Sequence, residues 1–209
     1  MLVLGINTVS DVCEAALVRD GVVVAEQSEP MRLGHDARLA PLVEAVMTCA
    51  GETYASLDRI AVVVGPGSFT GVRVGVALAR GLALTLDRPA VGVTSLEALA
   101  FGSEGRVLAA LPAKRRPPER SWWAQVVEHG RGAGEPVEAD EAGLAAMARD
   151  ATSLLTPDID AIELDLPKQT ARPSAVAAAR FVSRLDAEDL PSARPAYVRD
   201  PDATPVSRS

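Results

Sequence analysis

The sequence predicts an α/β protein of two similar lobes, each a mixed sheet flanked by helices. First, 209 residues with 48% hydrophobic side chains suffice to bury a substantial core in one large or two small domains. Second, three strand-like runs open the chain and are followed by helices and further strands. Third, the second half begins in the same way, which indicates a duplicated plan.

The first three elements are predicted to be antiparallel strands. Apolar runs cover residues 2–6, 13–18 and 22–26. Asp20-Gly21 joins the second run to the third, and this dipeptide is a strong hairpin signal because both residues tolerate a left-handed backbone.

Helices and strands alternate through the rest of the first half. Apolar residues at helical spacing predict a helix from Asp36, its expected N-cap, to Ala50. A strand over residues 60–64 leads into a long helix from Ser68 to Leu86. A strand over residues 90–93 and a helix over residues 95–101 complete the predicted first lobe, residues 1–103.

The second lobe is predicted to be smaller, over residues 104–209. Strands are expected over residues 106–111 and 121–128, with a glycine-rich turn at residues 130–134. A helix to about Arg149, a strand near Ile162 and a helix over residues 173–185 follow, before a proline-rich tail. Ligands of two-lobed folds often bind between the lobes.

The charge balance limits which partners the chain binds by itself. A net charge of −7 argues against direct contact with a phosphate backbone, and 3% aromatic residues offer few stacking platforms. The basic cluster at Lys114, Arg115, Arg116 and Arg120 is expected to be a solvated loop. With neither an export signal nor an apolar run of about 20 residues, we expect a cytoplasmic protein without a membrane span.

No catalytic or metal-binding constellation is expected. Cys13 and Cys49 lie in apolar contexts and are expected to be reduced and packed. His35 is followed one helical turn later by Leu39 instead of a second histidine, and His129 stands alone, so the spacing of a metal site is missing.

The segment Gly65-Pro-Gly-Ser-Phe-Thr-Gly-Val-Arg-Val-Gly joins a buried strand to a helix N-terminus. Unpaired N–H groups there favour an anion, while an ordinary tight turn capped by Ser68 explains the same pattern. Arg73 lies in the first turns of this helix, where the helix dipole disfavours a cation unless a phosphate or a partner carboxylate lies nearby. A Walker A loop is excluded because no Gly-Lys-Ser/Thr follows, and Asp87 is misplaced for a dinucleotide fold.

Small residues recur every four positions along the long helix, at Gly71, Gly75 and Ala79. They leave one helix face nearly flat, so another element can approach closely. Packing within the lobe and contact with another molecule explain this seam equally well.

The glycine-rich motif resembles that of the bacterial TsaB (YeaZ) family, accessory proteins in the synthesis of threonylcarbamoyladenosine in transfer RNA. The resemblance also covers residues 4–8, His35 with the Leu39 segment, the segment from Gly92 and the tail from Tyr197. It implies a fold of the actin, Hsp70 and sugar-kinase type.

The resemblance also implies a role: a non-catalytic scaffold subunit that binds and stabilises a TsaD-type catalytic subunit. Pairing would use the first-lobe helices, either with TsaD or as a homodimer, and a TsaE-type ATPase would join. Transfer RNA would be met only through the complex, which uses ATP, and this chain alone would bind no cofactor.

Partner or anion binding is assigned by this reasoning to one set of residues, with no catalytic or metal residue. The set is Gly65, Gly67, Ser68, Phe69, Thr70, Gly71, Arg73, Gly75, Ala79, His35 and Leu39. Asn7 stands where many members have Asp, which argues against metal–nucleotide binding. Two alternatives remain open: a small-molecule acid or sugar kinase, which needs a catalytic aspartate, and a metallopeptidase, which needs zinc.

Overall fold

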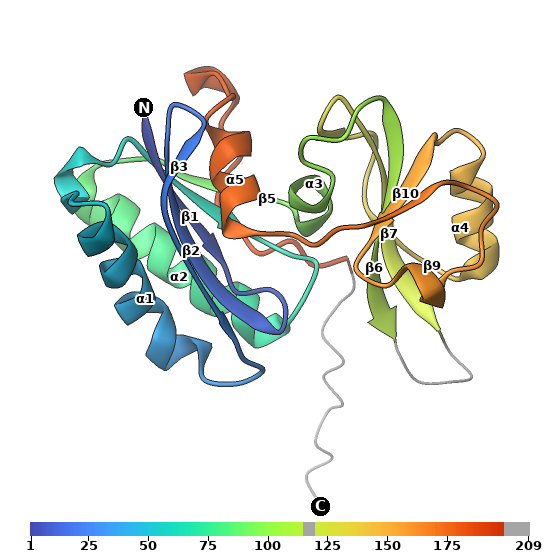
Figure 1. Ribbon diagram of the computed structural model, residues 1–209, viewed down its shortest axis with the longest axis horizontal. Helices are drawn as coiled ribbons and strands as arrows, with labels where there is room; N and C mark the ends of the chain where they lie inside the picture. The colour runs from blue at the N-terminus through green and yellow to red at the C-terminus, as the bar shows by residue number, and fades with distance from the viewer. Residues whose placement is uncertain (115–119, 199–209) are drawn as a thin grey trace, which may run out of the picture.

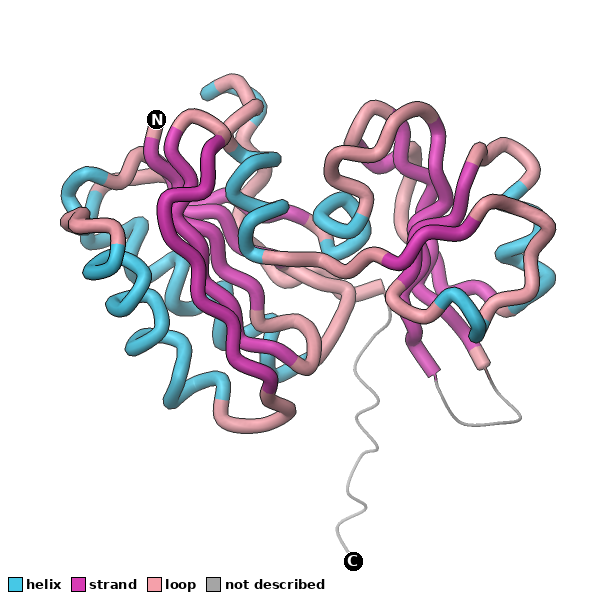
Figure 2. The backbone as a smooth tube through the Cα atoms, in the orientation of Figure 1, coloured by secondary structure: helices cyan, strands magenta, loops and turns pink. Residues whose placement is uncertain are grey.

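The computed structural model describes residues 1–114 and 120–198, which form two sheets side by side (Figure 1). The first sheet has five strands in the order β3-β2-β1-β4-β5. The second has the order β11-β10-β6-β7-β8, with β9 also paired to β7. Each sheet is covered by helices, as Figure 2 shows, so the predicted α/β fold with mixed sheets is confirmed.

The first sheet opens with the predicted antiparallel strands. At the hairpin, Asp20 and Gly21 have φ values of 50° and 81°, the left-handed conformations that this turn requires. The last two strands then pair in parallel with β1 and with each other. The strands are β1 (Leu2–Asn7), β2 (Val12–Arg19), β3 (Val22–Pro30), β4 (Arg59–Val63) and β5 (Ala90–Val93).

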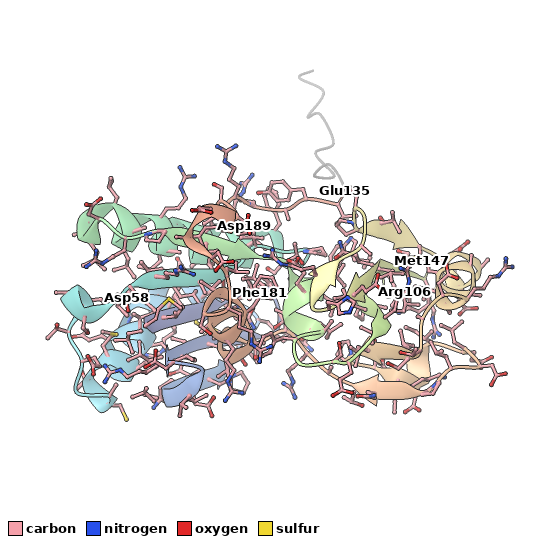
Figure 3. The ribbon with its side chains drawn as sticks, turned by 90° about the horizontal axis from the view of Figure 1, so that it is seen from above. Asp58, Arg106, Glu135, Met147, Phe181 and Asp189 are labelled. Atoms are coloured by element: carbon pink, nitrogen blue, oxygen red, sulfur yellow. The ribbon has the colours of Figure 1, made fainter. Side chains whose placement is uncertain are left out.

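Helices cover both faces of the first sheet. The long helices α1 (His35–Cys49) and α2 (Phe69–Leu86) lie together on one face, and α5 (Ala175–Val182) lies on the other (Figure 1). The apolar side of α5 packs into the core of the first sheet, with Phe181 between the two lobes in Figure 3. The chain after residue 103 therefore does not stay in the second lobe, which differs from the predicted boundary.

The second sheet repeats the topology of the first. Its first two strands are antiparallel, and β10 and β11 add in parallel, just as β4 and β5 add to β1. The duplicated plan is therefore confirmed. The strands are β6 (Arg106–Lys114), β7 (Ser121–Glu128), β8 (Arg131–Gly132), β9 (Val137–Ala139), β10 (Ser153–Thr156) and β11 (Lys168–Thr170).

Alternating side chains of β6 build two separate cores. Val107 and Ala109 face the cluster that includes α3 (Ser95–Leu99), whereas Leu108 and Ala110 face the cluster that includes α4 (Glu141–Ala148). This is the period of two expected of a strand that is buried on both faces. Because α3 lies against the second sheet and also contacts α5, it links the lobes.

Three details differ from the sequence predictions. Helix α1 begins at His35 after Gly34, whose φ is 89°, so Asp36 lies in the first turn and is not the N-cap. Ile162 is a buried residue after the short helix η2 (Ile159–Ala161) and is not in a strand. Strands β8, β9, β10 and β11 were not predicted, and β8 lies within the predicted glycine-rich turn. Two further short helices are η1 (Tyr54–Ser56) and η3 (Ala187–Asp189).

Two predicted features lie largely outside the described residues. These are the basic loop from Lys114 to Arg120 and the tail beyond Val198.

Candidate functional site

The glycine-rich loop between β4 and α2 packs tightly against the turn that follows β1. A Cβ atom at Gly67 would overlap the carbonyl of Val9, and one at Gly71 would overlap the carbonyl of Thr8. The N–H of Ser68 donates a hydrogen bond to the Val9 carbonyl over 2.7 Å. Glycine is therefore needed here because two backbone segments approach closely.

Ser68 caps helix α2. Its Oγ accepts a hydrogen bond from the N–H of Gly71 over 3.2 Å, as the tight-turn interpretation predicts. Since the N–H groups of Ser68 and Gly71 are both engaged within the chain, the loop offers an anion fewer donors than the sequence suggested. Anion binding by Gly65, Gly67 and Thr70 stays a prediction.

Arg73 has neighbours that the sequence did not reveal. Its guanidinium lies 3.7 Å from the centroid of the Phe69 ring, and its Nε donates to the hydroxyl of Tyr197 over 3.1 Å. The rings of Phe69 and Tyr197 are 5.5 Å apart at their centroids. A cation over an aromatic face is stabilised by the ring quadrupole, so these contacts hold Arg73 against the start of α2.

The seam of small residues on α2 faces the protein's own sheet. Gly71, Gly75 and Ala79 are all buried. A Cβ atom at Gly75 would lie 2.5 Å from Oγ1 of Thr8 and 3.4 Å from a methyl group of Val62. The interpretation as packing within the lobe is therefore correct, and this face is not available to a partner.

The opposite, outer face of α2 is exposed and carries apolar residues beside Arg73 and Arg80. Leu84 is 87% exposed, Phe69 is 39% exposed, and Ala77 is also exposed. The helix carries two charged residues in all, Arg73 and Arg80. Sequence reasoning chose the small-residue face and missed the exposed apolar residues of the outer face, which are a signal for a contact surface.

Helix α2 is also the one helix of the described chain that is long and apolar enough to cross a membrane, judged by length and composition alone. The core helix of a water-soluble protein passes the same test, so this result is weak by itself. Helix α2 is nevertheless an exception to the prediction that no segment is long and apolar enough to span a membrane.

His35 and Leu39 lie on the inner side of α1. His35 is buried with its Nε2 3.2 Å from the carbonyl of Val12, and Leu39 is 1% exposed. Both residues fix α1 on the first sheet. A direct contact between either side chain and a partner is therefore inconsistent with its burial.

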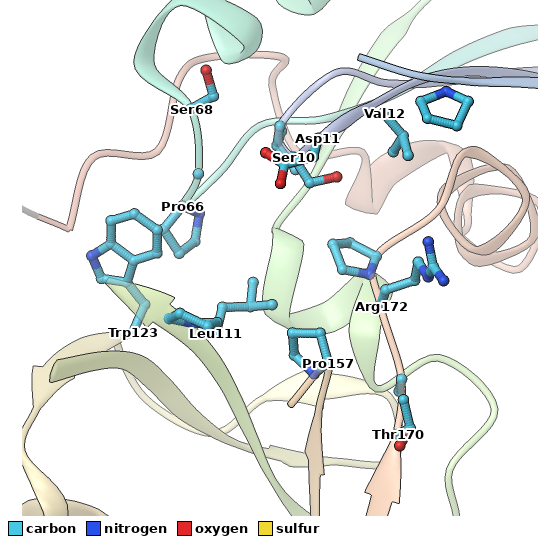
Figure 4. A pocket seen from close by; sticks show the side chains of 16 residues that line it. Ser10, Asp11, Val12, Pro66, Ser68, Leu111, Trp123, Pro157, Thr170 and Arg172 are labelled. Carbon is cyan, nitrogen blue, oxygen red and sulfur yellow. The ribbon is translucent and has the colours of Figure 1, made fainter. Parts of the chain in front are cut away.

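A cavity of about 660 Å³ lies between the lobes (Figure 4). Ser10, Asp11 and Pro66 line the side of the first lobe, and Leu111, Trp123 and Pro157 line the side of the second. Asp11 and Arg172 are its two charged lining residues. A nucleoside triphosphate would therefore meet a mostly apolar cavity with one guanidinium group to balance its charge.

Asn7 is part of a buried hydrogen-bond network beside this cavity. Its Nδ2 donates to a carboxylate oxygen of Glu14 over 2.8 Å and to the carbonyl of Pro173 over 3.1 Å. The same oxygen of Glu14 accepts from the N–H of Ala175 at the start of α5, over 3.2 Å. Asn7 thus joins β1 to β2 and to the chain that leads into α5, and its amide faces these groups.

Comparison with known proteins shows which proteins the chain resembles. A family model described as "TsaD: tRNA N6-adenosine threonylcarbamoyltransferase" matches residues 24–115. The tRNA threonylcarbamoyladenosine biosynthesis protein TsaB of Escherichia coli is 37% identical over 146 residues, 66% of this chain and 62% of that protein. The aligned segment thus spans less than two thirds of that relative. An uncharacterized protein of Mycobacterium tuberculosis is 34% identical over 98% of this chain and 95% of its own.

Solved structures agree over nearly the whole chain. YeaZ from Pseudomonas aeruginosa superposes with a TM-score of 0.71 at 25% identity, covering 94% of this chain and 99% of that one. The ROK hexokinase of Thermus thermophilus, with a TM-score of 0.55 and 14% identity, shares the fold. In sequence and in its two-lobed fold, the chain is therefore similar to proteins of the TsaB (YeaZ) family.

Proposed function

We propose that the chain is a non-catalytic subunit of the machinery that installs the threonylcarbamoyl group on adenosine in transfer RNA. In this role it binds and stabilises a TsaD-type catalytic subunit in the cytoplasm. A homodimer through the same surface is the alternative state of the free chain. A TsaE-type ATPase joins the assembled complex, which uses ATP. This chain contacts transfer RNA only as part of that complex.

The observation that carries this proposal is the group of exposed apolar residues on the outer face of α2. Leu84, Ala77 and Phe69 are exposed on a helix whose other face already covers the first sheet. Exposed apolar surface of this kind marks interaction sites, because covering it removes apolar area from water. The name of the relative from Escherichia coli, a tRNA threonylcarbamoyladenosine biosynthesis protein, supports the assignment to this pathway.

The position of Asn7 supports a non-catalytic role over the kinase alternative. A kinase of this fold needs a carboxylate to hold the metal–nucleotide complex, but position 7 carries an amide that donates to Glu14 and Pro173. The shared fold and the cavity between the lobes are the features that favour a kinase.

The test is co-purification with the TsaD-type subunit of the same cell, followed by a transfer RNA modification assay with and without this chain. The proposal expects a stable pair and modification that needs both proteins. A chain that stays alone and instead hydrolyses ATP or phosphorylates a small acid would establish the kinase alternative.

A matched pair of variants tests the surface itself. Leu84→Asp places a charge on the outer face of α2 and should weaken the pair at least 10-fold, since a buried unpaired charge is costly at an interface. Val22→Asp makes the same change at a residue that is 66% exposed on the β2–β3 hairpin and should have no effect. Equal binding by both variants would show that α2 is not the contact. Binding of the chain to lipid vesicles, lost in Leu84→Asp, would assign the face to a membrane.

A further inference from the structure

A second surface feature adjoins the outer face of α2. At the C-terminal end of this helix lies a hollow of about 640 Å³, formed by the helix, the turn that leads to β5 and the chain after η3. The residues that define it are Arg80, Leu84, Asp87, Arg88, Ser192 and Arg194. Two segments far apart in the sequence, residues 80–90 and 192–194, therefore contribute its arginines.

The hollow is basic in a chain that is acidic overall. Arg80, Arg88 and Arg194 contribute three guanidinium groups and Asp87 one carboxylate, whereas the whole chain has a net charge of −7. Within residues 1–114 and 120–198, none of these three arginines forms an ion pair. Three like charges around one hollow repel each other, so an anionic ligand would relieve a cost that the chain alone carries.

The backbone holds these groups in place. Arg88 follows Asp87, whose φ of 53° ends α2, and its Nε donates to the carbonyl of Leu57 over 2.9 Å. Ser192 bridges to Val91 on the edge of β5, which fixes the segment that carries Arg194. The hollow is therefore built before any ligand arrives.

The apolar surroundings indicate which anion fits. Leu84, the most exposed apolar residue of α2, lies at the hollow, and Ala83 and Ala90 line it. Arginine beside exposed apolar side chains is typical of protein interfaces, where arginine is enriched and most other charged residues are depleted. Leu84 also belongs to the outer face of α2, so the two surfaces are continuous.

We propose that this arginine hollow receives a carboxylate-bearing segment of the protein that covers the outer face of α2. The inference rests on the proposed function, because it assigns a second contact to the same partner. The outer face of α2, with Leu84 and Ala77, supplies the main contact area, and Asp or Glu side chains of the partner pair with Arg80 and Arg194. Such charge complementarity raises the association rate and fixes the orientation of the partner.

The test uses full-length chains and the purified TsaD-type subunit, with association followed at low and high salt. The double variant Arg80→Glu with Arg194→Glu should bind about 10- to 100-fold more weakly at low salt, mainly through a slower association rate. The difference should shrink at high salt, because salt screens exposed charges. Arg80→Lys with Arg194→Lys keeps the charge and should retain most of the affinity.

The control is Arg120→Glu with Arg149→Glu, which changes the net charge equally at two exposed arginines of the second lobe. Its affinity should stay within about 2-fold of the wild type if the effect is local. If the wild type binds, and Arg80→Glu with Arg194→Glu binds as tightly as Arg120→Glu with Arg149→Glu, the inference is wrong while the proposed function stands. If the wild type does not bind the subunit at all, both fail. If Arg80→Glu with Arg194→Glu loses only binding of inorganic phosphate or transfer RNA, the hollow is a phosphate site and the inference is again wrong.

Discussion

The buried pair of Asn7 and Glu14 allows a sharp test of the proposal that the chain is not a kinase. Asn7→Asp is nearly isosteric and places a carboxylate where a kinase of this fold would need one. In this protein, however, position 7 already donates a hydrogen bond to Glu14 over 2.8 Å. The variant therefore brings two carboxyl groups into contact in a buried site, and one of them must hold a proton.

The expected cost follows from the distance. Two charges 2.8 Å apart repel by about 6 kcal/mol at an effective dielectric constant of about 20. Holding a proton at pH 7 on an aspartate, which releases it near pH 3.9 when unfolded, costs about 4 kcal/mol. Protonation costs less than the repulsion between two charges, so one of the two carboxyl groups of the folded variant stays protonated. The lost hydrogen bond to Pro173 adds about 1 kcal/mol at any pH.

The cost depends on pH with a definite sign. The folded variant binds a proton that the unfolded chain releases, so its stability is greatest below about pH 4 and falls as the pH rises. At pH 5 the protonation cost is about 1.5 kcal/mol, compared with about 4 kcal/mol at pH 7. Asn7→Asp should therefore approach the wild type as the solution becomes more acidic.

Urea unfolding of the wild type and Asn7→Asp at pH 5 and pH 7 measures this difference. The double variant Asn7→Asp with Glu14→Gln restores one amide and one carboxylate, so it should recover most of the stability and lose the extra pH dependence. A variant as stable as the wild type at pH 7 would refute the buried network. Stabilisation of Asn7→Asp by magnesium and ATP would instead favour the kinase alternative.

Three further predictions concern the first lobe. Gly75→Leu should lower the free energy of unfolding by about 3 kcal/mol or more, measured by urea unfolding, because the leucine side chain would overlap Thr8. A variant that stays folded but no longer binds the partner would instead show that the small residues of α2 contact another molecule. Gly71→Ala should cost at least about 1 kcal/mol in the same assay, since its Cβ would overlap the Thr8 carbonyl, and an unchanged midpoint would contradict that contact. Burial raises the pKa of the Cys13 thiol to about 11, so the folded state retains this proton more tightly than the unfolded chain. Stability should therefore fall by roughly 1–2 kcal/mol between about pH 8.5 and pH 11, and Cys13→Ala should flatten that slope. Alkylation of the native protein should modify the exposed Cys49 alone.

Local signals in the sequence predicted most of the first lobe. The hairpin at Asp20-Gly21 and the Ser68 cap of α2 follow from preferences of these residues that act over three or four positions. Strands β10 and β11 were missed because runs of four and three residues are too short to show a period. The packing of α5 on the first sheet was also missed, because it depends on contacts more than 100 residues apart in the chain.

The candidate site was harder to predict than the fold because one pattern fits two environments. Gly71, Gly75 and Ala79 allow close approach by any neighbour, and only the position of β1 and β4 shows that the neighbour is the same chain. The exposed face is identified by Leu84 and Ala77. Leucine and alanine are equally common in protein cores, so the sequence does not show that these two are exposed. Arg80 and Arg194 lie at one hollow only because the chain after η3 runs along β5.

The comparison of the two lobes explains why the helices are the better candidate for function. Both lobes have the same strand order and directions, but the connections differ. In the first lobe, α1 leads to β4 and α2 leads to β5, whereas in the second lobe α4 leads to β10 and only the short η2 precedes β11. The second lobe therefore lacks a counterpart of α2, and it adds Leu111, Trp123 and Pro157 to a mostly apolar cavity. The first lobe instead has an 18-residue helix whose exposed face carries apolar residues and arginines. The chain shares the fold of a kinase, its Asn7 beside the cavity is engaged in internal hydrogen bonds, and its long helix exposes apolar residues. These features suit a chain that holds a partner.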